Sequence, residues 1–121
     1  MAKAKVRCSI GKVKTLQHTA SGAIAVDDIV VVNGRVCVAY ADIANGDSGQ
    51  MIYQADEIDA PKASGVTIEA GDDAYWDNGN SVFTNVEGSN ILCGIFRQGA
   101  GSSATECNLE LNNLPVPAGG S

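Results

Sequence analysis

The fold is decided by one stretch of strand and turn residues, Asp27-Asp28-Ile29-Val30-Val31-Val32-Asn33-Gly34-Arg35-Val36-Cys37-Val38-Ala39-Tyr40. The Asn33-Gly34 pair is a strong signal for a two-residue β-hairpin, because a type I′ turn needs positive φ at both central residues. The flanking residues are apolar at nearly every position, so both faces of these strands should be covered. We therefore expect a buried hairpin formed by residues 29–32 and 35–41.

A similar sequence pattern occurs twice in the chain. The first copy opens with Ala20-Ser21-Gly22 and runs into the hairpin just described. The second opens with Ala63-Ser64-Gly65 and continues through Asp72-Asp73-Ala74-Tyr75-Trp76 to an Asn78-Gly79 turn. After a longer excursion it reaches Leu92-Cys93-Gly94-Ile95-Phe96. Such internal similarity argues for duplicated β-hairpin units within one small domain.

The rest of the chain likewise consists of short strand-like segments joined by Gly-rich turns. Strands are predicted at residues 4–10, 29–32, 35–41, 50–55, 73–76, 81–84, 91–97 and 105–111. Eight short strands at this spacing predict an all-β fold, a small β-barrel or β-sandwich built from short hairpins. At most one short helical turn is expected, at residues 60–64, with Asp59 as its cap and Pro61 in its first turn.

Charge divides the chain into unequal parts. Residues 1–14 contain the basic side chains Lys3, Lys5, Arg7, Lys12 and Lys14 and no acid, whereas residues 15–121 contain three basic and fourteen acidic residues, a net charge of −11. We interpret residues 1–14 as a basic N-terminal arm or first strand, 15–111 as the β-rich body, and 112–121 as a flexible C-terminal tail. The arm is either a solvated strand or a segment that docks on an acidic surface, such as a neighbouring copy.

Catalytic and phosphate-binding patterns are absent from the sequence. The single Gly-Lys pair, Gly11-Lys12, lacks the glycine and the Ser or Thr of a phosphate-binding loop, and no Gly-x-Ser-x-Gly motif accompanies the lone His18. We therefore expect no enzyme activity, no catalytic residues and no cofactor.

The acidic pairs Asp27-Asp28 and Asp72-Asp73 do not follow a calcium-loop pattern, and such residues also bond the local backbone in turns. No metal site is expected. Tyr75 and Trp76 are interpreted as core residues or as the anchor of a subunit interface, in preference to a small-molecule platform.

Four scattered cysteines, Cys8, Cys37, Cys93 and Cys107, fit neither a zinc site nor a paired motif. They are expected to be free thiols in a chain made in a reducing cytoplasm, although a Cys37–Cys93 contact across the two repeats stays open. No apolar run is long enough for a membrane helix, and no signal peptide is expected.

Several of these sequence segments resemble those of a small family of tailed-phage proteins. The residues that carry the resemblance are Pro61-Lys62-Ala63-Ser64-Gly65, the run Ile68-Glu69-Ala70-Gly71-Asp72-Asp73-Ala74-Tyr75-Trp76-Asp77, the Gly94-Ile95-Phe96 strand and the closing Leu109-Glu110-Leu111. The resemblance spans roughly residues 3–111. The family is often catalogued as RecA/RadA-like phage recombinases, a label that the missing phosphate-binding loop makes hard to defend here.

The resemblance implies a capsid decoration, or cement, protein, made in the host cytoplasm and added to the exterior of the expanded phage head. Its expected partners are the major capsid protein and its own copies in a homotrimer, and it is expected to stabilise the head by bridging capsid subunits. The candidate contact residues are Lys3, Lys5, Arg7, Lys12, Lys14, Tyr75 and Trp76. Two alternatives are a nucleic-acid-binding recombination accessory protein, which the acidic body disfavours, and a carbohydrate-binding module or minor enzyme built on Tyr75, Trp76 and the nearby aspartates.

Overall fold

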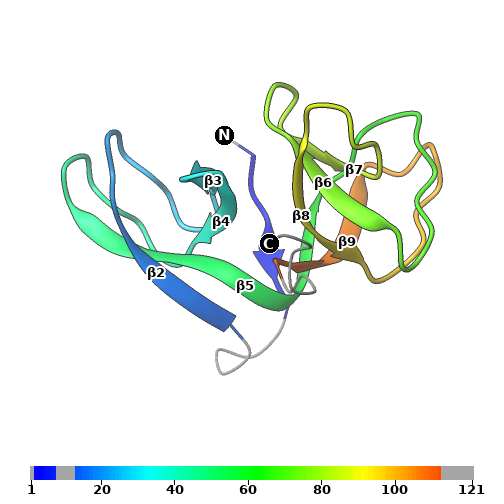
Figure 1. The fold of residues 1–121 in the computed structure, drawn as a ribbon. Helices are drawn as coiled ribbons and strands as arrows, with labels where there is room; N and C mark the ends of the chain where they lie inside the picture. The colour runs from blue at the N-terminus through cyan, green and yellow to red at the C-terminus, as the bar shows by residue number, and fades with distance from the viewer. Residues whose placement is uncertain (1, 8–12, 113–121) are drawn as a thin grey trace, which may run out of the picture.

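The computed structural model describes residues 2–7 and 13–112, and these form one antiparallel sheet system without a helix (Figure 1). The strands are β1 (Lys5–Val6), β2 (Val13–Thr19), β3 (Ile29–Val32), β4 (Arg35–Ala39), β5 (Ser48–Pro61), β6 (Asp73–Asp77), β7 (Val82–Thr84), β8 (Ile91–Phe96) and β9 (Glu106–Leu111). Their order is β3-β4-β5-β9-β8-β6-β7, and both β1 and β2 pair with β5. The predicted all-β class is confirmed.

The predicted hairpin of β3 and β4 is also confirmed. Its register pairs Val32 with Arg35, and the two turn residues have the positive φ angles that a type I′ turn requires, 52° at Asn33 and 79° at Gly34. The sequence pattern therefore located both strands of this hairpin and the turn that joins them.

Strand β5 is longer than predicted, and the predicted helical turn at residues 60–64 is wrong. Ala60 and Pro61 are the last residues of β5, which pairs there with β9. Buried Ile58, Ala60 and Lys62 alternate with half-buried residues, so the pleat of a strand continues to the end of the segment. Pairing with β9 on one edge and β1 on the other outweighs the local preference of an Asp-x-Pro sequence for a helix start.

The sequence analysis also missed β2, and it did not predict how the N-terminal strands pair with β5. β2 has mixed polar and apolar residues, Val-Lys-Thr-Leu-Gln-His-Thr, and it pairs with the first part of β5 along Thr15 to Thr19. Of the strand predicted at residues 4–10, only β1 lies within the described residues, because residues 8–12 fall outside them.

The duplication is a property of the fold as well as of the sequence. Asp28 donates its backbone N–H to Ala25 O and accepts the Ala25 N–H with its side chain, and Asp72 makes the same two bonds with Glu69. The residue before each aspartate has positive φ, Asp27 in the first copy and Gly71 in the second. In both copies the turn leads into a strand, β3 or β6, that pairs with the next long strand of its half, β4 or β8.

The two halves share β5 (Figure 1). Its first part closes the first half by pairing with β4 and β2, and its last part opens the second half by pairing with β9. A register shift between Ala55 and Ile58 marks the change from one half to the other. Only the second half contains β7, which lies in the long connection that replaces the tight Asn33-Gly34 turn.

Two apolar clusters form the core. The larger one extends over both halves and contains the rings of Trp76 and Phe83, whose centroids lie 4.7 Å apart. The smaller one lies in the first half alone, around Cys37, Ile43 and Met51. Burial of these apolar side chains between curled strands is the main favourable contribution to folding.

Gly94 is required by the close packing of β8 on β9. A Cβ added at this position would overlap the backbone carbonyl of Glu110, which is held in the sheet by the pairing of Ile95 with Glu110. No flexible side chain is available to move, so even a methyl group must displace a strand.

We predict that Gly94→Ala lowers the free energy of unfolding by about 3 kcal/mol, because it forces backbone apart in the core. Gly101→Ala is the matched control, since nothing lies within 4 Å of a Cβ there, and its effect should stay within about 0.5 kcal/mol. Urea unfolding followed by the fluorescence of Trp76 measures both. Equal stability of the two variants would contradict the assigned register of β8 and β9.

Candidate functional site

Residues 2–7, called here the N-terminal strap, join the first half of the molecule to the second. At one end Ala2 O accepts the Ile29 N–H at 2.9 Å, and the Ala4 N–H donates to Asp27 O at 3.0 Å. At the other end β1 pairs with β5, with Lys5 opposite Asp59. The strap therefore docks on the body of its own chain.

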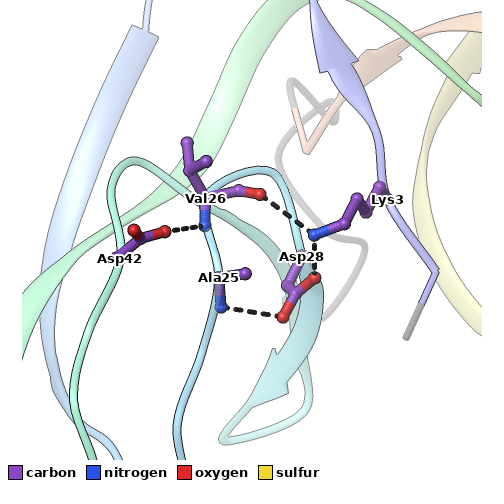
Figure 2. Close-up of polar contacts among 5 residues, drawn as sticks. All are labelled: Lys3, Ala25, Val26, Asp28 and Asp42. Atoms are coloured by element: carbon purple, nitrogen blue, oxygen red, sulfur yellow. Dashed lines mark hydrogen bonds and ion pairs between the residues drawn. The ribbon is translucent and has the colours of Figure 1, made fainter.

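Lys3 and Asp28 form an ion pair at the first-half end of the strap (Figure 2). Lys3 Nζ lies 2.7 Å from Asp28 Oδ1 and also donates to Val26 O at 3.3 Å. The Asp28 side chain is 7% exposed, whereas that of Lys3 is 54% exposed. Burial alone would raise the pKa of Asp28, but the hydrogen bonds from Lys3 and from the Ala25 N–H, with the charge of Lys3, lower it below the ordinary value.

A second charged cluster lies where the strap meets β5. Arg7 Nε lies 3.4 Å from Asp59 Oδ2, and Arg97 Nη1 lies 3.1 Å from Glu57 Oε1. The buried Asn108 joins these pairs, since its Nδ2 donates to Glu57 Oε2 at 2.8 Å and to Asp59 Oδ1 at 2.7 Å. Arg7 is therefore engaged within the chain, as Lys3 is.

Of the three remaining basic residues of the arm, two lie within the described residues and both are exposed. Lys5 and Lys14 are exposed on the edge formed by β1 and β2, opposite Asp59 and Gln54 respectively, and neither makes an ion pair within residues 2–7 and 13–112. Lys12 lies outside the described residues. The structure thus separates two tethered cations from two cations that face solvent.

Tyr75 and Trp76 have opposite environments although they are neighbours in β6. Trp76 is 2% exposed, packs on Phe83 and donates its Nε1–H to Asn78 Oδ1 at 2.9 Å, so it is a core residue of this chain. Tyr75 is half-buried on the other face of β6, in register with Thr84 and Leu92. Burial, with the nearby charges of Glu87 and Asp73, raises the pKa of Tyr75.

Within residues 2–7 and 13–112 four large apolar side chains are exposed, two in each half. Val26 and Tyr40 lie in adjoining loops of the first half, where the Asp27 N–H donates to Ala39 O. In the second half Leu92 is paired with Tyr75, and the Val86 N–H donates to Thr84, which is paired with Tyr75 as well. We call these the first-half patch (Val26, Tyr40) and the second-half patch (Tyr75, Val86, Leu92). The sequence analysis named only Tyr75 among these five residues, because the exposure of a single apolar residue in a loop or strand has no periodic signal.

The acidic pairs serve turns, as the residue types indicated. Asp28 and Asp72 each accept a backbone N–H three residues earlier, and Asp77 accepts the N–H and the side-chain amide of Asn80. These bonds lower the pKa of Asp72 and Asp77. Within the described parts of the chain no three His, Cys, Asp or Glu side chains gather as metal ligands would.

The described cysteines are buried free thiols, at positions 37, 93 and 107. Burial raises the pKa of all three, of Cys37 to about 11 and of Cys107 to about 12. Thiols that stay protonated and buried act as small apolar side chains. Cys8 lies outside the described residues, and no helix in the described part is long and apolar enough to cross a membrane.

We predict that Lys3→Met lowers the free energy of unfolding by about 1 kcal/mol at pH 7, because Asp28 loses a charged hydrogen-bond donor whose exposure to solvent weakens the pair. The pKa of Asp28 is lowered in the folded chain, so this contribution is present above its ordinary value of 3.8 and is lost as the pH falls below it. Urea unfolding at pH 7 and pH 2.5, with Lys5→Met as the control, measures the effect. A difference between Lys3→Met and the unmodified chain that stayed constant with pH would contradict the role of Asp28.

Comparison with known proteins gives one informative match. Residues 8–111 match the family model described as phage cement protein, and no curated protein matches the chain. The match covers the repeated turns, the shared strand β5 and the closing strand β9, and it lends no support to the recombinase label. The chain belongs to the phage cement protein family, which makes it a structural protein of the phage capsid.

Proposed function

We propose that this chain binds the exterior of the phage head and stabilises the expanded shell by bridging neighbouring capsid subunits, with the major capsid protein as its partner. The observation that carries the proposal is the family match over residues 8–111 on a body made of two similar halves joined by β5. A body with related surfaces at its two ends is suited to span two neighbouring subunits. Many copies held by such contacts on a closed shell gain avidity beyond any single contact.

The exposed edge of β1 and β2 is the proposed capsid contact. Lys5 and Lys14 carry uncompensated positive charge there, against an acidic body. Lys3 and Arg7 are held by Asp28 and Asp59, and their role in this proposal is to fix the strap. The division into arm 1–14, body 15–111 and tail 112–121 stays a prediction, and β2 runs across the first of its boundaries.

The two apolar patches support a ring of copies, for which we propose a homotrimer. A head-to-tail interface joins two different surfaces of one chain and closes into a ring when the rotation permits. The first-half patch and the second-half patch are two such surfaces, and they lie on different halves of the molecule. Trp76 supports the second-half patch from inside, since it is buried beneath β6, the strand that presents Tyr75. Synthesis in the host cytoplasm agrees with the three buried free thiols.

Co-sedimentation of the purified chain with expanded heads that lack it tests the function, with duplex DNA as a parallel ligand. Saturable binding to heads, a higher temperature of head disruption and no complex with DNA are the expected results. Binding to DNA without binding to heads would overturn the proposal.

We predict that the double variant Lys5→Gln/Lys14→Gln binds heads about tenfold more weakly at low salt, and that the difference shrinks as salt is added, because exposed charges are screened. The matched control is Gln98→Glu/Ser103→Glu, which makes the same change in net charge at exposed positions of the second half. Equal weakening by both double variants would show that net charge acts on its own and that the β1–β2 edge is not the contact.

A further inference from the structure

The two halves differ at one edge. In the second half β7 pairs with Tyr75, Trp76 and Asp77 along the outer edge of β6. The repeated aspartate turns place Val31, Val32 and Asn33 of the first half at the corresponding positions, since Asp28 and Asp72 precede β3 and β6 in the same way. Within the described residues the strap contacts β3 as far as Ile29, and no strand pairs with β3 at residues 31–33.

The peptide groups on this edge are suited to accept a strand. The Ile29 N–H points away from β4 and donates to Ala2 O at 2.9 Å. Because alternate residues of a strand direct their N–H and C=O groups to the same side, those of Val31 point to the same edge. Among the described residues nothing pairs with these groups of Val31, so an incoming strand would find a donor and an acceptor there, flanked by the apolar side chains of β3.

A cavity of about 200 Å³ is lined by His18, Ser21, Gly22, Ala23, Ile24 and Val30, and Val30 directly precedes the edge residues of β3. The turn places Ile24 and Val30 where the second half has Ile68 and Ala74. In the second half these two residues belong to the core that holds Trp76 and Phe83.

Phe83 is fully buried, and it reaches this core from β7. Its carbonyl accepts the Ala63 N–H at 2.8 Å, which closes the second half between β7 and the end of β5. The first half has Val32 in the place of Trp76 and no described counterpart of Phe83. Val30 thus links the cavity to the edge of β3, and among the described residues this slot has no strand and no aromatic side chain like those of β7.

We propose that this slot, formed by the edge of β3 at residues 31–33 and the adjoining cavity, binds an extended segment of the capsid subunit that carries a phenylalanine-sized apolar side chain. The chemistry of the ligand is that of β7 itself, Val82-Phe83-Thr84, because the chain already uses this segment to fill the equivalent place. The capsid as donor rests on the proposed function, whereas the slot and its peptide chemistry rest on the duplication. Addition of a strand to a free sheet edge combines backbone hydrogen bonds with a side-chain pocket for specificity.

The probe is the chain's own β7 segment as a capped peptide, residues 80–87, added to the full-length chain. We expect amide hydrogen exchange at Val31 to slow at least about tenfold on peptide addition, while exchange at Val30, which faces β4, stays unchanged. The same peptide with Phe83→Asp should have no effect. Failure of the unmodified peptide to slow exchange at Val31 would overturn the slot. A second outcome would also overturn it: exchange at Val31 is already slow without peptide and becomes fast when residues 113–121 are deleted.

A plug variant separates the slot from the proposed function. Gly22 lines the cavity, so Gly22→Phe is designed to fill it, and the fold should tolerate the change because nothing lies within 4 Å of a Cβ there. Gly101→Phe is the matched control, since a Cβ at Gly101 also has nothing within 4 Å. We expect Gly22→Phe to abolish the peptide effect and to weaken head binding about tenfold, with no change for Gly101→Phe. Loss of the peptide effect with undiminished head binding would overturn the capsid as the donor. If the unmodified chain bound no heads at all, the proposed function would fail while the peptide result still stood.

Discussion

The pairing of β5 on both of its edges is the constraint on which the rest of the structure depends. Its first part lies between β4 and β2, and its last part lies between β9 and β1. Each half needs this strand to complete its own sheet, so the halves cannot separate without breaking a ladder of hydrogen bonds and exposing the larger core cluster. Asn112 adds to the junction, since its side-chain amide donates to Val36 O and Tyr53 O where β4 and β5 diverge.

This constraint explains why the polar groups of the chain are mostly structural. The aspartates of the repeated turns accept hydrogen bonds from backbone N–H groups, and Lys3 and Arg7 of the strap form ion pairs with Asp28 and Asp59. The cluster around Asn108 ties β9 to β5 by the same means. A body organised in this way holds exposed groups such as Lys5, Lys14 and the two apolar patches in defined places on paired strands and their loops. Such an arrangement is what the proposed bridging of capsid subunits would require.

The duplication also shows where the two halves agree and where they differ. Each half has the same turn, the same pair of central strands and the same isolated pairing of loops, Ile24 with Ile43 and Ile68 with Ala100. The second half closes its barrel with β7 and fills it with Phe83, whereas the first half keeps a tight turn and, among the described residues, an edge at residues 31–33 without a partner strand. A repeat that is complete in one copy and incomplete in the other indicates what chemistry the incomplete copy can accept.

The sequence by itself determined the all-β class, the β3–β4 hairpin, the duplication and the turn role of the aspartates, because each depends on local patterns: period-two burial, Asn-Gly turn chemistry and Asx hydrogen bonds. Only the tertiary structure decided that residues 56–61 continue β5, that Val13–Thr19 form β2, and that Lys3 and Arg7 are tethered while Lys5 and Lys14 are exposed. It also decided that Trp76 is core while Tyr75 is half-buried, and that Val26, Tyr40, Val86 and Leu92 are exposed. These features depend on which distant strands pair, and pairing over long sequence separations leaves no local pattern in the residues that take part.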